Sequence, residues 1–338
     1  MEANILIQTA RAIFANNKGI LAMDESIGTC NKRFAEMGIP QTEDYRRAYR
    51  EWILTSPNLG NFISGVILFD ETIRQKKKDG TPFLTCIQDA GILPGIKVDM
   101  GAKDLAGHPG EKITEGLDGL RERFQEYATM GAKFAKWRAV ITIGPNMPTR
   151  ACLEANTQAL ARYAALCQEA NLVPIVEPEV LMDGNHSLER CAEVSLETLH
   201  TLFNALYHQN ILLEGMILKP NMVISGLDSP VQASIEDVAQ STLECLRRNV
   251  PAAVGGIAFL SGGQSSELAT AHLNRMHKTQ SPLPWDLSFS FGRALQEPAL
   301  SIWKGEEANI EQAQKALLHR AECNYKAVKG EYTAEMEK

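Results

Sequence analysis

Eight short β-rich segments, each followed by a stretch of helical composition, constrain the fold of this chain more than any other feature. The segments cover residues 19–25, 63–70, 95–99, 133–141, 172–180, 216–221, 254–261 and 287–292. A polar residue stands near the end of each one: Asp24, Asp70, Lys97, Lys136, Glu177, Lys219, Ser261 and Arg293. These end residues are on average about 38 positions apart, which leaves room for one strand and one crossover helix.

The stretches between these segments carry the composition and the start signals of helices. Residues 149–170 are rich in Ala and Leu, residues 187–209 carry leucines among charges, and residues 234–249 begin with Ser and two acidic residues. Eight β-α units close naturally into a parallel (β/α)8 TIM barrel, which is an α/β fold. A doubly wound sheet is the competing architecture, but it rarely reaches eight units without a nucleotide-binding fingerprint.

No low-complexity linker or change of composition divides the 338 residues. The length alone suggests two domains, but α/β barrels exceed the usual domain length as single units. We therefore expect one barrel domain over residues 1–338, with an N-terminal helix before the first strand. A C-terminal helix and tail are expected after about residue 305.

Composition excludes several classes of protein and cofactor. The 34 Lys and Arg residues against 41 Asp and Glu give a net charge of −7, which disfavours nucleic-acid binding. No apolar stretch approaches the roughly 20 residues that span a bilayer, so we expect no membrane partner. Neither a nucleotide-binding glycine motif nor a histidine cluster occurs, and we expect neither a cofactor nor a metal ion. Seven scattered cysteines without a C-x-x-C pair fit a reducing cytoplasm.

Charged residues inside otherwise apolar strands mark the candidate site, because TIM-barrel enzymes place their chemistry at the carboxyl ends of the strands. Strand alternation puts Lys136 and Arg138 on one face, and it puts Glu177 and Glu179 on one face of the next strand. Any one of these residues could belong to a structural ion-pair lattice instead, but the feature recurs at the same end of five strands. The predicted mouth has a net charge of about +2, which favours an anionic ligand, and it contains Asp24, Glu177, Glu179, Lys97, Lys136, Arg138, Lys219 and Arg293.

Phosphate is the anion that the last two segments favour. The Ser261–Gly263 sequence leads into a helix beginning near Ser265, so backbone amides can approach an anion closely. Gly292 and Arg293 follow the eighth segment and add a guanidinium fork. TIM barrels usually hold phosphate at these two loops, although a Ser-Gly-Gly sequence by itself is more often a plain turn.

Lys219 is a candidate nucleophile, because the sequence ILKP surrounds its amine with apolar residues. Burial and a neighbouring cation such as Lys136 favour a neutral amine, which is the form that attacks a carbonyl carbon. A glutamate of the fifth segment, Glu177 or Glu179, could then carry protons while a carbinolamine loses water.

With these residues the chain resembles the class I fructose-1,6-bisphosphate aldolases from about residue 19 to residue 332. The motifs occur in that family's order and at about its spacing: GILAMDES, GVILFDET, GIKVD, FAKWR, VPIVEPE, LKPNM, FLSGGQS and FSFGRAL. The resemblance implies a (β/α)8 barrel, usually a homotetramer, that reversibly cleaves fructose 1,6-bisphosphate to dihydroxyacetone phosphate and glyceraldehyde 3-phosphate. It further implies a cytoplasmic enzyme of glycolysis and gluconeogenesis that needs no metal ion.

The resemblance also implies a role for each matching residue. Lys219 forms the Schiff base at the C2 ketone, Glu177 is the acid and base of the carbinolamine steps, and Glu179 supports it. Lys136 holds positive charge in the site with Arg138 nearby, and Asp24 takes the C4 hydroxyl proton as the C3–C4 bond breaks. The C1 phosphate is expected on Ser261, Gly262, Gly292 and Arg293. The distal phosphate is expected on Ser26, Thr29, Arg33 and Lys97.

The C-terminal region departs from the vertebrate-type members of the family, which end in a tyrosine implicated in protonation of the enamine. Here the last tyrosine is Tyr332. We therefore expect a residue fixed in the barrel, such as Glu177, to protonate the enamine through water.

Two other functions stay open on the sequence alone. The motifs define the C1 end of a ligand better than its distal end, so a Schiff-base aldolase for a different phosphorylated sugar is the runner-up. A non-catalytic protein that keeps the fold is the second alternative, and the intact set of Lys219, Glu177, Lys136 and Asp24 argues against it. The preference between bisphosphate and monophosphate substrates is undecided.

Overall fold

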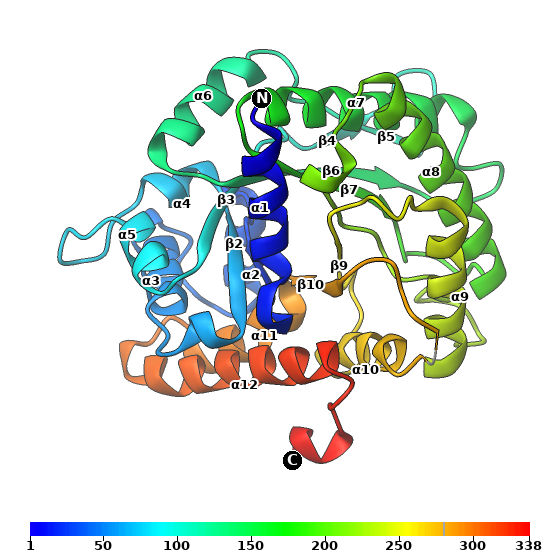
Figure 1. Ribbon diagram of the computed structural model, residues 1–338. Helices are drawn as coiled ribbons and strands as arrows, with labels where there is room; N and C mark the ends of the chain where they lie inside the picture. The colour runs from blue at the N-terminus through cyan, green and yellow to red at the C-terminus, as the bar shows by residue number, and fades with distance from the viewer. Residues whose placement is uncertain (280) are drawn as a thin grey trace.

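Eight parallel strands form a closed barrel at the centre of the computed structural model, which describes residues 1–279 and 281–338 (Figure 1). Neighbouring strands follow the order β1, β2, β3, β6, β7, β8, β9, β10, and β10 pairs with β1 again. This confirms the (β/α)8 barrel predicted from the sequence. The bounds are β1 Gly19–Met23, β2 Ile63–Leu68, β3 Leu93–Lys97, β6 Phe134–Ile141, β7 Val173–Val180, β8 Ile217–Leu218, β9 Ile257–Phe259 and β10 Leu287–Phe291.

Each predicted strand is present, with differences at the ends. β3 begins at Leu93, two residues earlier than expected, and β9 begins only at Ile257. β8 contains just two residues, so Lys219 lies directly after the strand rather than in it. The backbone amide of Lys219 still donates to the carbonyl oxygen of Val176 on β7 at 2.8 Å, which keeps this residue in register with the barrel.

Helices form the outer ring of the barrel. The helices predicted after the fourth, fifth and sixth strands begin where expected, because Thr149, Ser187 and Ser234 each accept a hydrogen bond from a backbone amide of the first turn. Among the described residues, no helix combines the length and the apolar character that crossing a membrane requires. The bounds are α1 Ala3–Phe14, α2 Ile27–Glu36, α3 Glu43–Leu54, α4 Asp70–Arg74, α5 Phe83–Asp89, α6 Leu120–Met130, α7 Arg150–Glu169, α8 Leu188–His208, α9 Ile235–Asn249, α10 Ser266–His277, α11 Arg293–Trp303 and α12 Ile310–Val328.

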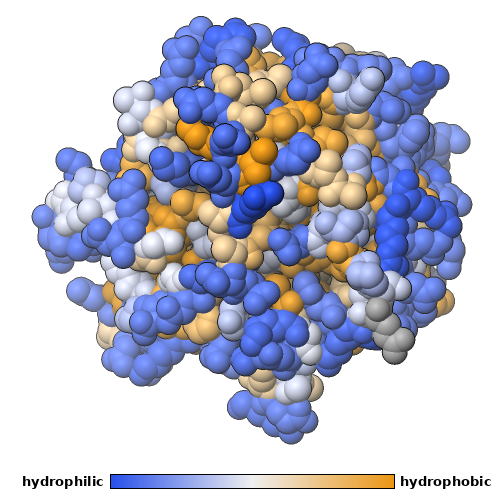
Figure 2. Space-filling model, in the orientation of Figure 1, coloured by the Kyte–Doolittle hydropathy of each residue, from blue (hydrophilic) through white to orange (hydrophobic). Residues whose placement is uncertain are grey.

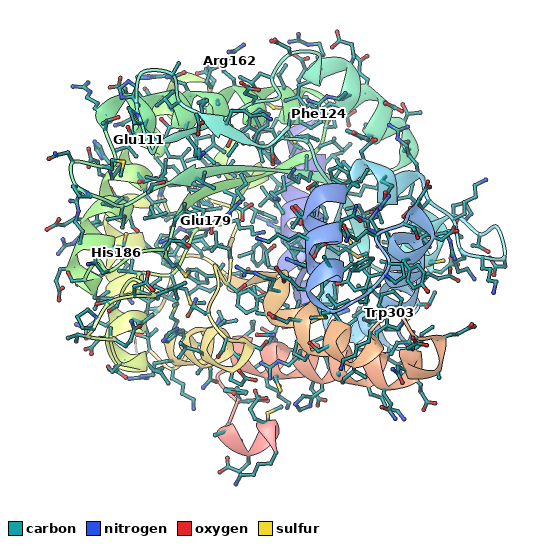
Figure 3. All side chains as sticks on the ribbon, turned by 180° about the vertical axis from the view of Figure 1, so that it is seen from behind. Glu111, Phe124, Arg162, Glu179, His186 and Trp303 are labelled. Carbon is teal, nitrogen blue, oxygen red and sulfur yellow. The ribbon has the colours of Figure 1, made fainter. Side chains whose placement is uncertain are left out.

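The helix α1 closes the amino end of the barrel. Its apolar face, which includes Leu6, Ile13 and Phe14, packs against the side chains that fill the barrel interior. In Figure 1 the helix crosses the front of the barrel, and Figure 2 shows hydrophobic side chains near the centre of this face and hydrophilic ones over most of the rim. Figure 3 shows the molecule from behind, where Glu179 lies near the centre of the carboxyl end.

An antiparallel hairpin that the sequence did not predict follows β3. Its strands are β4 (Ala102–Asp104) and β5 (Lys112–Thr114), and it precedes α6. Between these two strands, the buried carboxylate of Glu111 accepts hydrogen bonds from the backbone amide and the hydroxyl of Thr149, both at 2.6 Å. The hairpin is thereby attached to the start of α7.

Aromatic rings fill the barrel interior where neighbouring strands carry glycine. The ring of Phe134 on β6 lies against Gly65 of β2 and Gly95 of β3. A Cβ atom on Gly95 would overlap this ring, which is fully buried. Glycine is therefore required at residue 95 for packing, and not for its backbone conformation.

We expect Gly95→Ala to lower the free energy of unfolding by about 1–3 kcal/mol, the usual effect of an overpacked core. Urea unfolding of the two proteins measures the difference. Gly28→Ala on α2 is the control, because no atom lies within 4 Å of its added Cβ. That variant should match the wild-type protein or exceed its stability by up to about 1 kcal/mol. Equal stability of Gly95→Ala and the wild-type protein would contradict the packing described for Phe134.

Candidate active site

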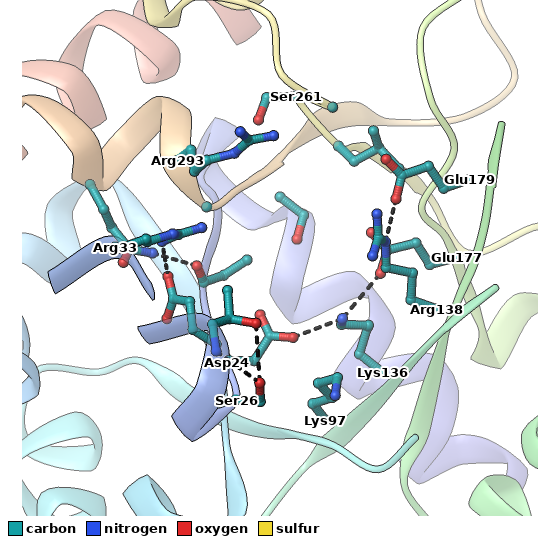
Figure 4. A pocket seen from close by; sticks show the side chains of 18 of the residues that line it. Asp24, Ser26, Arg33, Lys97, Lys136, Arg138, Glu177, Glu179, Ser261 and Arg293 are labelled. Carbon is teal, nitrogen blue, oxygen red and sulfur yellow. Dashed lines mark hydrogen bonds and ion pairs between the residues drawn. The ribbon is translucent and has the colours of Figure 1, made fainter. Parts of the chain in front are cut away.

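A cavity of about 550 Å³ opens at the carboxyl end of the barrel. Its size is in the usual range for a small-molecule site. All fourteen residues that the sequence marked as site residues line it: Asp24, Ser26, Thr29, Arg33, Lys97, Lys136, Arg138, Glu177, Glu179, Lys219, Ser261, Gly262, Gly292 and Arg293. Segments far apart in the sequence thus converge on one cavity, as Figure 4 shows.

The ammonium group of Lys136 on β6 lies at the centre of the cavity floor. Its Nζ atom is 2.7 Å from Oδ2 of Asp24, which directly follows β1, and 3.2 Å from Oε2 of Glu177 on β7. All three side chains are almost fully buried. The Lys136 ammonium therefore pairs with one carboxylate that follows β1 and with another on β7.

These contacts determine the ionisation of the three groups. Burial raises the pKa of Asp24, but the charges of Lys136 and Lys219 outweigh it and hold this pKa at about 2. Burial likewise opposes ionisation of Glu177, whose pKa is nevertheless lowered by Lys136 and Lys219. Burial lowers the pKa of Lys136, and Asp24 and Glu177 reverse that effect and raise it. The floor therefore contains two carboxylates and one ammonium, all charged at neutral pH.

Lys219 forms an ion pair with Glu177. Its Nζ atom lies 3.3 Å from Oε1 of Glu177, while Oε2 of the same carboxylate faces Lys136. The sequence-based interpretation placed Lys136 as a cation near Lys219, and the structure adds that Glu177 interacts with both amines. The geometry also separates the two glutamates that the sequence left as alternatives, since Glu179 pairs with Arg138 instead.

The remaining floor residues form ion pairs with their neighbours on the barrel. Lys97, at the end of β3, lies 3.1 Å from Oδ1 of Asp99. The other carboxylate oxygen of Asp99 accepts a hydrogen bond from the backbone amide of Arg138 at 3.2 Å. Arg138 itself is the most exposed of the charged residues on the barrel strands, with 42% of its side-chain surface accessible.

Ser261, Gly262 and Arg293 gather on one side of the cavity. Arg293 is the first residue of α11, and a Cβ atom on Gly263 would lie 3.4 Å from its Nη2 atom. Within the described parts of the chain, Arg293 forms no ion pair and no side-chain hydrogen bond. The guanidinium thus lies over the 261–263 turn with donors available for an anion.

The predicted distal phosphate residues also line the cavity, and Figure 4 shows Ser26 and Lys97 on the side away from Ser261, with Arg33 closer to Arg293. Ser26 caps α2, and its hydroxyl is 3.1 Å from that of Thr29. Arg33 donates to Glu25 at 2.5 Å, so one arm of its guanidinium is already occupied. These residues therefore offer hydroxyls and cations, but beside them lies a carboxylate that the sequence-based assignment did not include.

The predicted excess of positive charge in the mouth is wrong for the lining as a whole. The lining contains seven cations and seven carboxylates, because Glu25, Glu36, Asp99 and Glu297 add negative charge and only Lys32 and Arg33 add positive charge. The carboxylates of the floor are paired with lysines or arginines. An anion is therefore attracted by local donors such as Arg293 and not by a net charge.

A helical pattern could have revealed Lys32 and Glu36, two lining residues of α2 that the sequence analysis missed. Thr29, Lys32, Arg33 and Glu36 all line the cavity, and their spacing places them on one face of the helix. Thr29 and Arg33 were expected from the family resemblance, whereas Lys32 and Glu36 could have been recognised only from this helical spacing.

Two conspicuous polar residues of the sequence do not line the cavity. Asp70, at the end of the second predicted strand, instead accepts a hydrogen bond from the hydroxyl of Tyr127 at 2.8 Å. Tyr332 is buried, and its hydroxyl donates to Glu337 at 2.7 Å. Neither His nor Cys occurs in the lining, and the one cluster of His, Cys and carboxylate within the described residues, at His319, lies elsewhere.

Comparison with known proteins decides the family. The family model for fructose-bisphosphate aldolase class-I matches residues 5–338. The chain belongs to the class-I fructose-bisphosphate aldolase family. It is 58% identical over 333 residues to a probable fructose-bisphosphate aldolase class 1 of Xanthomonas campestris, covering 98% of this chain and 99% of the relative.

Relatives from other kingdoms support membership of the class-I aldolases. The chain is 50% identical over 330 residues to the cytosolic fructose-bisphosphate aldolase 6 of Arabidopsis thaliana, covering 98% of this chain and 92% of the relative. The fold is similar to that of a Plasmodium falciparum fructose-bisphosphate aldolase solved with TRAP and a small-molecule inhibitor. That comparison has a TM-score of 0.96 and 45% identity over 98% of this chain and 96% of the solved chain.

The ion pairs of the aldolase floor make stability depend on pH. The pKa of Asp24 falls from 3.8 to about 2 on folding, so its ionised form stabilises the fold above about pH 4. Each pKa unit corresponds to about 1.4 kcal/mol, which gives a contribution of about 2 kcal/mol. We expect this contribution to disappear as the pH falls from about 4 towards 2.

Urea unfolding between pH 2 and pH 7 tests this expectation. The pH-dependent part of the unfolding free energy should shrink by about 2 kcal/mol in Asp24→Asn. It should stay unchanged in Asp228→Asn, since Asp228 is exposed and forms no ion pair with any described residue. Equal pH dependence in Asp24→Asn and the wild-type protein would show that Lys136 does not stabilise the ionised carboxylate.

Proposed function

We propose that this aldolase reversibly cleaves fructose 1,6-bisphosphate through a Schiff base on Lys219. The observation that carries the proposal is the contact between the buried Lys219 amine and the Glu177 carboxylate, 3.3 Å apart. An amine must lose a proton before it can attack a ketone, and a carboxylate at this distance can accept that proton. The family membership and the named relatives support the same reaction.

The first half of the proposed reaction forms the iminium. The neutral Lys219 amine attacks C2 of the substrate, and the ketone oxygen becomes the hydroxyl of a carbinolamine. Glu177, now carrying a proton, returns it to this hydroxyl, which leaves as water. The nearby Lys136 ammonium stabilises Glu177 whenever this group is an anion.

The second half breaks the C3–C4 bond. Asp24 accepts the proton of the C4 hydroxyl while the bond electrons move into the iminium, which leaves an enamine and releases glyceraldehyde 3-phosphate. Protonation of the enamine at C3 and hydrolysis then release dihydroxyacetone phosphate and the free Lys219 amine. Because Asp24 is held as an anion by Lys136 and Lys219, it is ready to accept a proton at neutral pH. We propose Glu177 as the group that protonates the enamine through water, since Tyr332 is bound to Glu337 outside the cavity.

The two ends of the cavity suit the two phosphates of the substrate. We assign the C1 phosphate to Ser261, Gly262, Gly292 and Arg293, where the donors of Arg293 are available. We assign the distal phosphate to Ser26, Thr29, Arg33 and Lys97. Glu179 and Arg138 pair with each other, and we propose that they support the orientation of Glu177.

We also propose that residues 1–338 act as one catalytic domain that assembles as a cytoplasmic homotetramer. The resemblance to class I aldolases supports the assembly, and the cytosolic plant relatives support the location. Exposed apolar side chains such as Tyr207 and Val231 are available for subunit contacts, with 80% and 74% of their surface accessible.

Borohydride reduction in the presence of dihydroxyacetone phosphate tests the proposed nucleophile. Reduction should fix the three-carbon unit on Lys219, as peptide mass spectrometry would show. Lys219→Ala should abolish labelling and cleavage, whereas Lys133→Ala should keep both, because Lys133 is exposed outside the cavity. Chelators should leave the activity intact. Label found on Lys97 or Lys136 would contradict the assignment.

Arg293→Ala tests the proposed C1 phosphate site. A hydrogen bond to a charged group contributes about 1.5–3 kcal/mol, so the KM for fructose 1,6-bisphosphate should rise about ten-fold or more. The KM for fructose 1-phosphate should rise by a similar factor, because both substrates carry this phosphate. Arg247→Ala on the exposed side of α9 is the control. An unchanged KM in Arg293→Ala would place the C1 phosphate elsewhere.

A further inference from the structure

The second strand contributes no described residue to the cavity, although its sequence motif is conspicuous. β2 runs directly into α4, whose second residue is Glu71. β1 and β2 are parallel neighbours, with Met23 opposite Leu68, so their carboxyl ends lie side by side. The start of α4 is therefore adjacent to the loop that carries Asp24.

Glu71 binds two arginines of α3. The Nε atom of Arg46 lies 2.8 Å from both carboxylate oxygens, and the Nη1 atom of Arg50 lies 2.9 Å from Oε1. Burial opposes ionisation of Glu71, but the contacts with Arg46 and Arg50 lower its pKa. The three side chains form a charged cluster behind the active-site loop and outside the cavity.

Arg50 connects this cluster to the loop after β1. Its side chain is completely buried, and its Nη2 atom donates to the backbone carbonyl oxygen of Glu25 at 3.1 Å. Glu25 lies between Asp24 and Ser26 in the sequence. The contact is thus made to the peptide between Glu25 and Ser26, one residue beyond Asp24.

A gain in the stability of the fold is a weak explanation for the buried ion pair of Arg50 and Glu71. Taking a guanidinium out of water is costly, and apolar residues of similar volume often replace a buried ion pair without loss of stability. A guanidinium differs from an apolar side chain in having directed donors, which fix a carbonyl oxygen at a defined distance. Arg50 uses two such donors at once, one to Glu71 and one to the loop.

We propose that Arg50 is a positioning residue for Asp24, and that Glu71 holds Arg50 in place. This inference rests on the proposed function, in which Asp24 accepts the C4 hydroxyl proton. Arg50 does not line the cavity, so it acts only through the loop. The polar end of β2 therefore supports the catalytic residue of the neighbouring strand instead of supplying one of its own.

Positioning of Asp24 affects one half of the reaction and leaves the other half intact. Schiff-base formation involves Lys219 and Glu177, which belong to β7 and the segment after β8, across the barrel from the Arg50 contact. Bond cleavage requires Asp24 close to the C4 hydroxyl. A misplacement of about 1 Å can lower a rate about 100-fold. Loss of Arg50 should therefore slow cleavage while trapping on Lys219 continues.

Arg50→Met is the main test. Glu71 keeps both contacts with Arg46 in this variant, so no buried carboxylate loses all its partners, and the fold should survive. We expect kcat for fructose 1,6-bisphosphate cleavage to fall about 100-fold. The KM should stay within about three-fold, and borohydride trapping of dihydroxyacetone phosphate on Lys219 should stay within about two-fold. Arg50→Lys, which keeps the charge but not the two-donor fork, should restore only part of kcat.

Arg74→Met is the matched control. Arg74 is the last residue of α4 and forms ion pairs with Asp70 of the same helix and Glu126 of α6, but it is exposed and does not contact the loop. Its kcat and trapping should equal those of the wild-type protein. If Arg50→Met does not fold, the Glu71→Gln variant is tested in its place. Its kcat should fall by less than the roughly 100-fold expected for Arg50→Met, and trapping on Lys219 should be retained.

Several results would overturn the assignment. An unchanged kcat in a folded Arg50→Met or Glu71→Gln protein would show that the loop needs no support from the cluster. An equal fall in kcat and in trapping would show a general structural defect. Absence of trapping in the wild-type protein would instead overturn the proposed function, and the role of Arg50 with it.

Discussion

The ammonium group of Lys136 is the interaction on which the active site depends. Two carboxylates that close to one another would not both stay ionised inside a barrel without a cation between them. Lys136 supplies that cation and in doing so joins β6 to β7 and to the loop after β1. The chemistry assigned to Asp24 and the chemistry assigned to Glu177 require the same charge, so the two halves of the reaction share one electrostatic element.

The strand β6 shows how an apolar barrel can present such a group. Its inward-facing residues change from Phe134, which fills the interior, to Lys136 on the floor and then to the partly exposed Arg138. Residues 134–138 of this strand thus extend from the packed core to the solvent-accessible mouth of the barrel. The helix α1 closes the amino end with apolar side chains, so the charged layer is confined to the carboxyl end.

The sequence predicted the barrel and the convergence of the site because both depend on local signals. In a parallel barrel, charged residues at the carboxyl ends of apolar strands all lie at the same end of the barrel. Thr149 and Ser234 mark the starts of helices because their own side chains cap the first turn. The position of Glu177 between two lysines could not be predicted in this way. It depends on which side chains from β6, β7 and the segment after β8 meet, and that is set by the register of the barrel and by side-chain rotamers.

The charge count failed for a related reason. Two of the carboxylates that cancel the expected positive charge come from helices outside the predicted strands, Glu36 of α2 and Glu297 of α11, and Glu25 and Asp99 at the ends of predicted segments were not counted. Asp99 was visible at the end of the third segment, but its role became clear only from its contacts with Lys97 and the amide of Arg138. The strand pattern alone therefore predicts the charged residues on the cavity floor better than the charged residues that helices and loops add around it.

The balance of charge in the lining also determines how a ligand arrives. A strongly cationic mouth would draw anions in over distances beyond the roughly 8 Å screening length of physiological salt. A balanced lining produces little field at that range, so capture begins only when a phosphate is close enough to meet Arg293 directly. Encounter with a sugar phosphate should then not slow as ionic strength rises, because the long-range field comes from the chain's net charge of −7, and the products should leave without having to escape a long-range electrostatic attraction.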